Sequence, residues 1–66
     1  MRIVVNGEAR DAADGLTLVR LVETLGAPPA RVATVVNGDL VRAPNRAARR
    51  LQDGDRVDVL AFAPGG

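Results

Sequence analysis

Residues 17–26 read Thr-Leu-Val-Arg-Leu-Val-Glu-Thr-Leu-Gly and predict one amphipathic helix. Thr17 is suited to the N-cap, because its hydroxyl can accept a hydrogen bond from a free N–H of the first turn. Gly26 suits the position after the helix, which often needs a positive φ, and Pro28-Pro29 prevents continuation. One apolar stripe follows the spacing i, i+3, i+4 and i+7 and consists of Leu18, Leu21, Val22 and Leu25.

Two hairpins are predicted on either side of this helix. The short β-branched run 3–5 is followed at once by Asn6-Gly7, and residues 8–11 supply the returning strand before Asp14-Gly15 ends it. Asn-Gly favours a type I′ turn, whose two central residues both need positive φ. After the helix, the run 32–36 ends in Asn37-Gly38 and returns through residues 39–41 in the same way.

The last third of the chain predicts a bend, a turn and a final strand. Pro44 and Asn45 mark the bend, with Asn45 as the expected cap of one helical turn, and Leu51 is the expected anchor of this stretch. Asp53-Gly54-Asp55 predicts a tight turn, since two carboxylates are too few for a calcium site. Residues 56–62 form the longest strand, with Val57, Val59 and Ala61 on one face and Asp58, Leu60 and Phe62 on the other.

These elements predict an α+β fold in which one mixed sheet packs on one main helix. The first and last strands are the most apolar, so we expect them to pair in parallel at the centre of the sheet. This is the β-grasp, or ubiquitin-like, architecture. With only 66 residues the chain has room for one core. We therefore expect a β-grasp domain over residues 1–62 and a flexible reactive tail over residues 63–66.

The composition argues against an enzyme. The sequence contains no Cys, His, Ser, Lys, Tyr or Trp, which removes the usual general base, the common nucleophiles and the commonest metal ligands. The remaining hydroxyl nucleophiles are three threonines. We therefore expect no catalysis by the chain itself, no bound cofactor and no metal site.

Charge and hydropathy restrict the partners and the location. Nine arginines face eight acidic residues, and Phe62 is the sole aromatic residue, so no stacking platform for nucleic acid exists. The arginines Arg46, Arg49 and Arg50 are interpreted as a solvated stretch, with an acidic partner as the alternative. No apolar run reaches membrane-spanning length and no signal peptide is recognised. We expect a cytoplasmic protein that is monomeric alone.

The final residues present one group that can undergo chemistry. Gly65 and Gly66 have no side chains and can pass through a narrow channel, while Pro64 stiffens the base of the tail. A free α-carboxylate has an ordinary pKa of about 3.5, so it is ionised at neutral pH and is a poor acyl donor. A partner that uses ATP must therefore activate it. The alternative is that two terminal glycines are an ordinary frayed end.

The whole chain resembles the bacterial sulfur-carrier proteins of the ThiS and MoaD type. The resemblance is carried by Val36-Asn37-Gly38-Asp39-Leu40-Val41, by the run 51–57 (Leu-Gln-Asp-Gly-Asp-Arg-Val) and by Gly65-Gly66, and is strongest to the thiamine-biosynthesis carriers, the ThiS family. It implies that a ubiquitin-activating-type adenylyltransferase adenylates the Gly66 carboxylate with ATP. A persulfide donor protein then supplies sulfur, and the Gly66 thiocarboxylate delivers it to thiazole synthase.

Other functions are also compatible with the sequence. The same carrier chemistry can serve molybdopterin synthesis, tRNA thiolation or a cysteine route. A ubiquitin-like adaptor that is never activated would share the body of the fold. We expect the activating enzyme and the sulfur acceptor to dock on the open face of the sheet, where Leu60 and Phe62, together with Val4, form an apolar patch beside the tail. The alternative is that the strand register or a bulge places Phe62 at the edge of the core.

Overall fold

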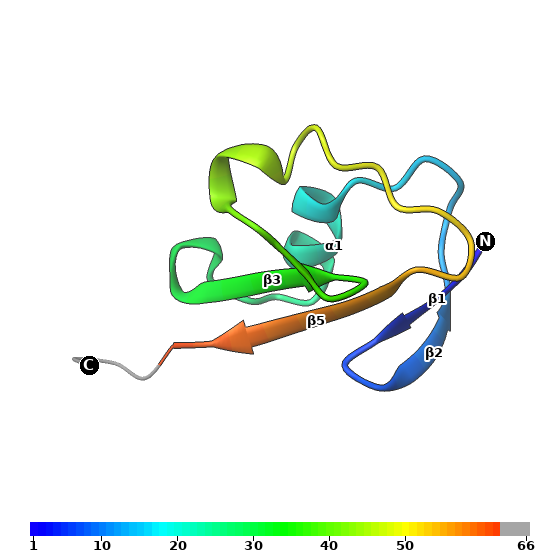
Figure 1. Cartoon of the computed structure of the whole chain (residues 1–66), viewed down its shortest axis with the longest axis horizontal. Helices are drawn as coiled ribbons and strands as arrows, with labels where there is room; N and C mark the ends of the chain where they lie inside the picture. Colours follow the sequence, from blue (N-terminus) through cyan, green and yellow to red (C-terminus); the bar gives the residue numbers. More distant parts are fainter. Residues whose placement is uncertain (63–66) are drawn as a thin grey trace.

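A computed structural model describes residues 1–62 and contains a five-stranded mixed sheet in the order β2-β1-β5-β3-β4. The single α-helix, α1, lies against one face of the sheet, and two short 3₁₀ turns, η1 and η2, connect the elements (Figure 1). This arrangement confirms the predicted β-grasp architecture. In chain order the elements are β1 (Arg2–Val5), β2 (Glu8–Asp11), α1 (Leu18–Thr24), η1 (Pro29–Arg31), β3 (Val32–Val36), β4 (Asp39–Val41), η2 (Ala43–Asn45) and β5 (Arg56–Ala61).

Both hairpins turn through Asn-Gly in the predicted way. Asn6 and Gly7 have φ values of 50° and 84°, and Asn37 and Gly38 have 52° and 86°. Asparagine tolerates this left-handed region better than other residues with a side chain, and glycine enters it without steric cost. The turns therefore set the register of the β1–β2 and β3–β4 pairs, with Val5 opposite Glu8 and Val36 opposite Asp39.

β5 occupies the centre of the sheet. It pairs in parallel with β1, where Val5 lies opposite Val57, and antiparallel with β3 along its length, from Val36 opposite Val57 to Val32 opposite Ala61. The predicted parallel pairing of the first and last strands is confirmed. The predicted strand ran one residue further, but the amide of Phe62 still donates to the carbonyl of Arg31 at 2.8 Å.

The two turn asparagines also fix β5 with their side chains. The Asn6 Oδ1 atom accepts the amide of Val59 at 2.8 Å, and the Asn37 Oδ1 atom accepts the amide of Arg56 at 2.9 Å. The Asn37 Nδ2 group donates to Asp55 at 2.9 Å. Each hairpin turn is therefore bonded to the central strand, which extends the sheet contacts beyond the backbone ladder.

The helix follows its predicted pattern. The Thr17 Oγ1 atom accepts the amide of Arg20 at 3.4 Å, and Leu25 forms the C-cap ahead of Gly26, which has a φ of 71°. The stripe faces the sheet, so its first three members are buried and Leu25 is half-buried against the core. The buried apolar side chains are Ile3, Val5, Leu18, Leu21, Val22, Val32, Val36, Val41, Leu51 and Val57.

The segment between β4 and β5 closes the core beside the start of α1. The amide of Leu18 donates to the Arg49 carbonyl at 2.9 Å, and the amide of Leu51 donates to the Leu16 carbonyl at 2.8 Å. Leu51 is buried, as predicted for an anchor. The prediction that Asn45 caps this turn was wrong, because Asn45 is the last residue of η2. Arg42 occupies the N-cap and makes no side-chain capping bond. Pro44 in the first turn has no amide N–H, so one fewer donor there needs a partner.

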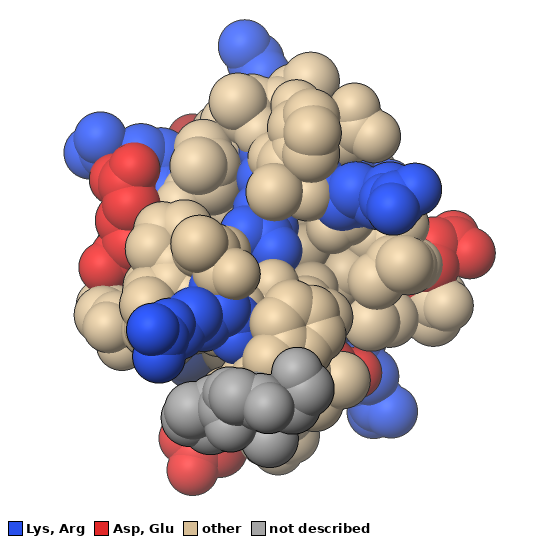
Figure 2. All heavy atoms as spheres, turned by 90° about the vertical axis from the view of Figure 1, so that its left-hand side faces the viewer, with Lys and Arg blue, Asp and Glu red and all other residues tan. Residues whose placement is uncertain are grey.

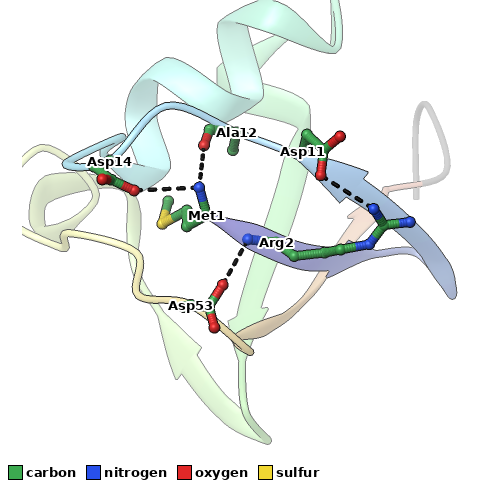
Figure 3. A network of polar contacts seen from close by, with 6 residues as sticks. All are labelled: Met1, Arg2, Asp11, Ala12, Asp14 and Asp53. Carbon is green, nitrogen blue, oxygen red and sulfur yellow. Dashed lines mark hydrogen bonds and ion pairs between the residues drawn. The ribbon is translucent and has the colours of Figure 1, made fainter.

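The start of β1 is held from both sides (Figure 3). The Met1 amino group donates to the Ala12 carbonyl at 2.8 Å and to Asp14 at 3.2 Å, which ties it to the chain after β2. The amide of Arg2 donates to Asp53 at 2.7 Å, which ties it to the turn before β5. The Met1–Asp14 ion pair involves an almost fully exposed carboxylate and stabilises the fold little, so its main effect is to position the start of β1.

One polar cluster lies inside the fold at the β3–β4 pair. Thr34 is fully buried, and its hydroxyl donates to the Val41 carbonyl at 2.6 Å while accepting from Arg46 Nε at 3.0 Å. Arg46 is only 4% exposed and donates further to the carbonyls of Pro29 at 2.9 Å and Val32 at 2.7 Å. The guanidinium therefore bonds β3, the η1 turn and the segment after η2 together.

Asn6→Ala is predicted to lower the free energy of unfolding by roughly 1–3 kcal/mol, since it combines a positive φ with loss of the bond to Val59. Asn6→Gly keeps the φ and loses only the bond, so its cost is predicted to be smaller. Urea denaturation of both variants measures the two terms. Equal stability of Asn6→Ala and the wild type would contradict the proposed role of this turn.

Thr34→Val is predicted to destabilise the fold by about 1–3 kcal/mol, because it leaves the Val41 carbonyl and the Arg46 Nε–H without their buried partner. Thr34→Ser keeps the hydroxyl and is the matched control, with only a methyl group lost. Thermal and urea unfolding compare the two. A Thr34→Val protein more stable than Thr34→Ser would show that the hydroxyl is not needed.

Candidate functional site

The threonine hydroxyls all have structural roles. Thr17 caps α1, the Thr24 hydroxyl donates to the Arg20 carbonyl at 2.9 Å, and Thr34 is committed to the buried cluster. A catalytic hydroxyl needs a neighbouring base and access to substrate, and none of these three has both. Within residues 1–62 the structure thus offers no nucleophile–base pair.

The exit of the tail is set by the position of β5. β1 pairs with β5 only at Arg56 and Val57, so from Leu60 onward β5 is bonded to β3 alone. The strand runs to one end of the long axis of the molecule, where Phe62 is fixed by its bond to Arg31 (Figure 1). The predicted reactive residues Pro64, Gly65 and Gly66 lie outside the described residues.

An apolar patch covers the open face of the sheet next to this exit. Three large side chains are exposed: Leu40 by 64%, Leu60 by 55% and Phe62 by 58%. The register places Ala33 opposite Leu60 and Val35 opposite Leu40, so these residues share the face turned away from α1. We call these five residues the sheet patch. Exposed apolar side chains gathered in this way are typical of a protein-binding surface.

The structure brings together two of the three predicted partner-binding residues. Leu60 and Phe62 lie in the sheet patch, but Val4 is half-buried and lies opposite Arg56. Arg56 precedes Leu60 by four residues, so Val4 is separated from Leu60 by about 13 Å along β5. The sequence prediction missed Leu40. Its signal was the alternation within residues 39–41 combined with the tight Asn37-Gly38 turn, which together place Leu40 opposite Val35.

The arginine cluster does not form one solvated stretch. Arg46 is buried against Thr34, which makes the solvated interpretation wrong for this residue, while Arg49 is half-buried and Arg50 is exposed. Arg46 tolerates burial because two carbonyls and one hydroxyl accept its N–H groups. No sequence pattern distinguishes it from its neighbours, because the acceptors come from a distant segment of the chain.

The acidic turn before β5 is structural, as the sequence indicated. Asp53 accepts the amide of Arg2, and Asp55 accepts the amide of Gln52 at 2.8 Å. Residues 1–62 contain no group of three or more side chains arranged to hold a metal ion. In that same part of the chain no helix is long and apolar enough to cross a membrane.

Similarity to known proteins connects this geometry to one family. Over all 66 residues the chain is 33% identical to the thiazole synthase of Paramagnetospirillum magneticum and 38% identical to that of Magnetococcus marinus. In each case it spans only 20% of the relative's length, so it corresponds to one segment of those larger proteins.

Solved structures of thiamine biosynthesis proteins share the fold. The crystal structure of the thiamine biosynthesis protein ThiS from Geobacter metallireducens superposes with a TM-score of 0.87 at 30% identity and full coverage of both chains. A solution structure of a thiamine biosynthesis protein from the same organism gives 0.80 at 32% identity and covers all of this chain and 88% of the other. The model of the ThiS family matches residues 3–66, and the chain therefore belongs to the ThiS family.

Proposed function

We propose that this protein is a sulfur carrier for the synthesis of the thiazole of thiamine. Membership of the ThiS family supports this proposal, as do the thiamine-biosynthesis protein it superposes on and the thiazole synthases that contain a matching segment. The observation that carries the proposal is the geometry of the exit. The central strand ends at Ala61 beside an exposed apolar patch, and Gly65-Gly66 follow within five residues of sequence, while residues 1–62 offer no nucleophile–base pair.

The proposed chemistry takes place at the Gly66 carboxylate. A separate adenylyltransferase transfers AMP from ATP to this carboxylate and releases pyrophosphate. The attached AMP is the leaving group that a free carboxylate lacks. The terminal sulfur of a persulfide on a donor protein attacks the acyl carbon and AMP departs. A thiol then cleaves the sulfur–sulfur bond, leaving a thiocarboxylate on Gly66 and a disulfide on the thiol side. Thiazole synthase receives the sulfur.

The body of the domain serves as the handle for these enzymes. The sheet patch gives them an apolar surface, and Phe62 places that surface immediately before the tail. The protein acts as a co-substrate and binds no cofactor, since ATP is held by the activating enzyme. We propose that it works in the cytoplasm, is monomeric when alone, and requires neither nucleic acid nor membrane.

Intact-protein mass spectrometry tests the chemistry. The chain is incubated with ATP, a persulfide donor and a sulfur-carrier adenylyltransferase from the same cell, and it is predicted to gain the mass of one oxygen replaced by one sulfur. Fragmentation should assign the change to Gly66. A chain lacking Gly66 is the control and should fold normally without any gain. An unmodified wild-type chain, where a known carrier is converted, would support the adaptor alternative.

Phe62→Ala tests the sheet patch. Because Phe62 is exposed, the melting temperature is predicted to stay nearly unchanged, whereas conversion at limiting carrier concentration should fall by roughly tenfold, as for a loss of about 1–2 kcal/mol of binding. Val4→Ala, on the same face but distant from the exit, should have a smaller effect. If Phe62→Ala is converted at the wild-type rate, the patch does not dock the activating enzyme.

A further inference from the structure

Three segments that meet at the end of the molecule where β5 finishes carry arginine and no acidic residue. The segments 24–38, 40–52 and 59–62 contain no Asp or Glu, and the first two contain five of the nine arginines. The fold joins these segments, since Phe62 bonds to Arg31 and Arg46 bonds to Pro29. In Figure 2, which views this end, basic side chains reach the middle of the face while acidic ones lie toward its rim.

A groove of about 290 Å³ opens among these three segments. Two arginines, Arg42 and Arg46, contribute to its walls, and Leu40 and Phe62 of the sheet patch form part of its rim. The groove is therefore continuous with the apolar surface already assigned to docking. The remaining lining residues are apolar: Pro29, Ala30, Val32, Ala33, Val41 and Ala43.

The charge of Arg46 has no counter-ion among residues 1–62. Its acceptors are two carbonyls and one hydroxyl, and no carboxylate lies within ion-pair distance of it. Three of its five N–H donors are occupied, so two have no acceptor in the described part of the chain. A buried positive charge is weakly screened, and it favours an anion that enters the adjoining groove.

We propose that the groove binds a carboxylate side chain on an otherwise apolar segment of a protein partner. Arg42 is exposed and pairs with the carboxylate, while the buried Arg46 adds its uncompensated positive charge to the groove. Leu40 and Phe62 contact the apolar side chains on either side of the carboxylate. This inference rests on the proposed function, because the partner is taken to be the thiazole synthase that receives the tail.

The lining favours a protein over a nucleic acid. A single strand is bound by successive aromatic platforms along a basic track, and Phe62 is the sole aromatic residue in the chain. Two guanidinium groups beside proline, leucine and valine side chains match one carboxylate between apolar neighbours more closely than a row of phosphates. The site therefore adds a specific polar contact to an apolar docking surface.

Charge reversal tests the groove. Isothermal titration calorimetry with thiazole synthase from the same cell compares the wild type, Arg42→Glu and the control Arg20→Glu. The control makes the same change of charge on α1, where Arg20 is exposed and, among residues 1–62, forms one ion pair, with Glu23 at 3.6 Å. Arg42→Glu is predicted to weaken binding roughly 10- to 100-fold and Arg20→Glu less than about twofold, with wild-type affinity falling as salt rises.

The outcomes of these titrations distinguish the groove proposal from the carrier function. Equal affinities of Arg42→Glu and Arg20→Glu, with tight wild-type binding, would overturn the groove and leave the carrier function intact. If Arg42→Glu weakens the binding of a single-stranded oligonucleotide but leaves the affinity for thiazole synthase unchanged, the partner of the groove is a nucleic acid and not a protein. Absence of wild-type binding to thiazole synthase would overturn both the groove and the proposed acceptor, while the mass gain at Gly66 would still report separately on sulfur loading.

Discussion

The pairing of β5 with strands on both of its sides is the interaction on which the rest of the structure depends. β1 meets it in parallel and β3 antiparallel, and the side chains of Asn6 and Asn37 add bonds from the two hairpin turns. A strand fixed in this way cannot shift its register without turning its buried face outward. The same strand ends at Ala61, and the next residue, Phe62, is bonded to Arg31, so the sheet fixes the position of the last described residue.

This constraint gives the two faces of the sheet different roles. The face of the sheet toward α1 holds the core, whereas the opposite face is left with Leu40, Leu60 and Phe62 exposed. An enzyme that binds this face also holds Phe62, the residue before the tail, at a fixed position relative to the bound surface. Binding energy from the body can then be used to position a terminal group that has no side chain for recognition.

The sequence predicted the elements whose signals are local. The Asn-Gly turns, the helix stripe and the strand at residues 32–36 were placed correctly, because turn chemistry and periodicity act within a few residues. Features built from distant segments were not predictable: the burial of Arg46 depends on carbonyls of Pro29 and Val32, and Leu40 joins the patch through its partner Val35. The roles of Gly65 and Gly66 rest on family resemblance and chemistry.

The central claim is that sulfur travels on Gly66 from the donor to the thiazole. The most direct test prepares the chain with ³⁴S at the Gly66 thiocarboxylate and follows a single turnover with thiazole synthase and its other substrates. If Gly66 carries the sulfur, the label appears in the thiazole product in the same amount as it leaves the chain, which returns to its carboxylate mass. An unlabelled thiazole product formed while the chain keeps its ³⁴S would show that Gly66 does not supply the sulfur.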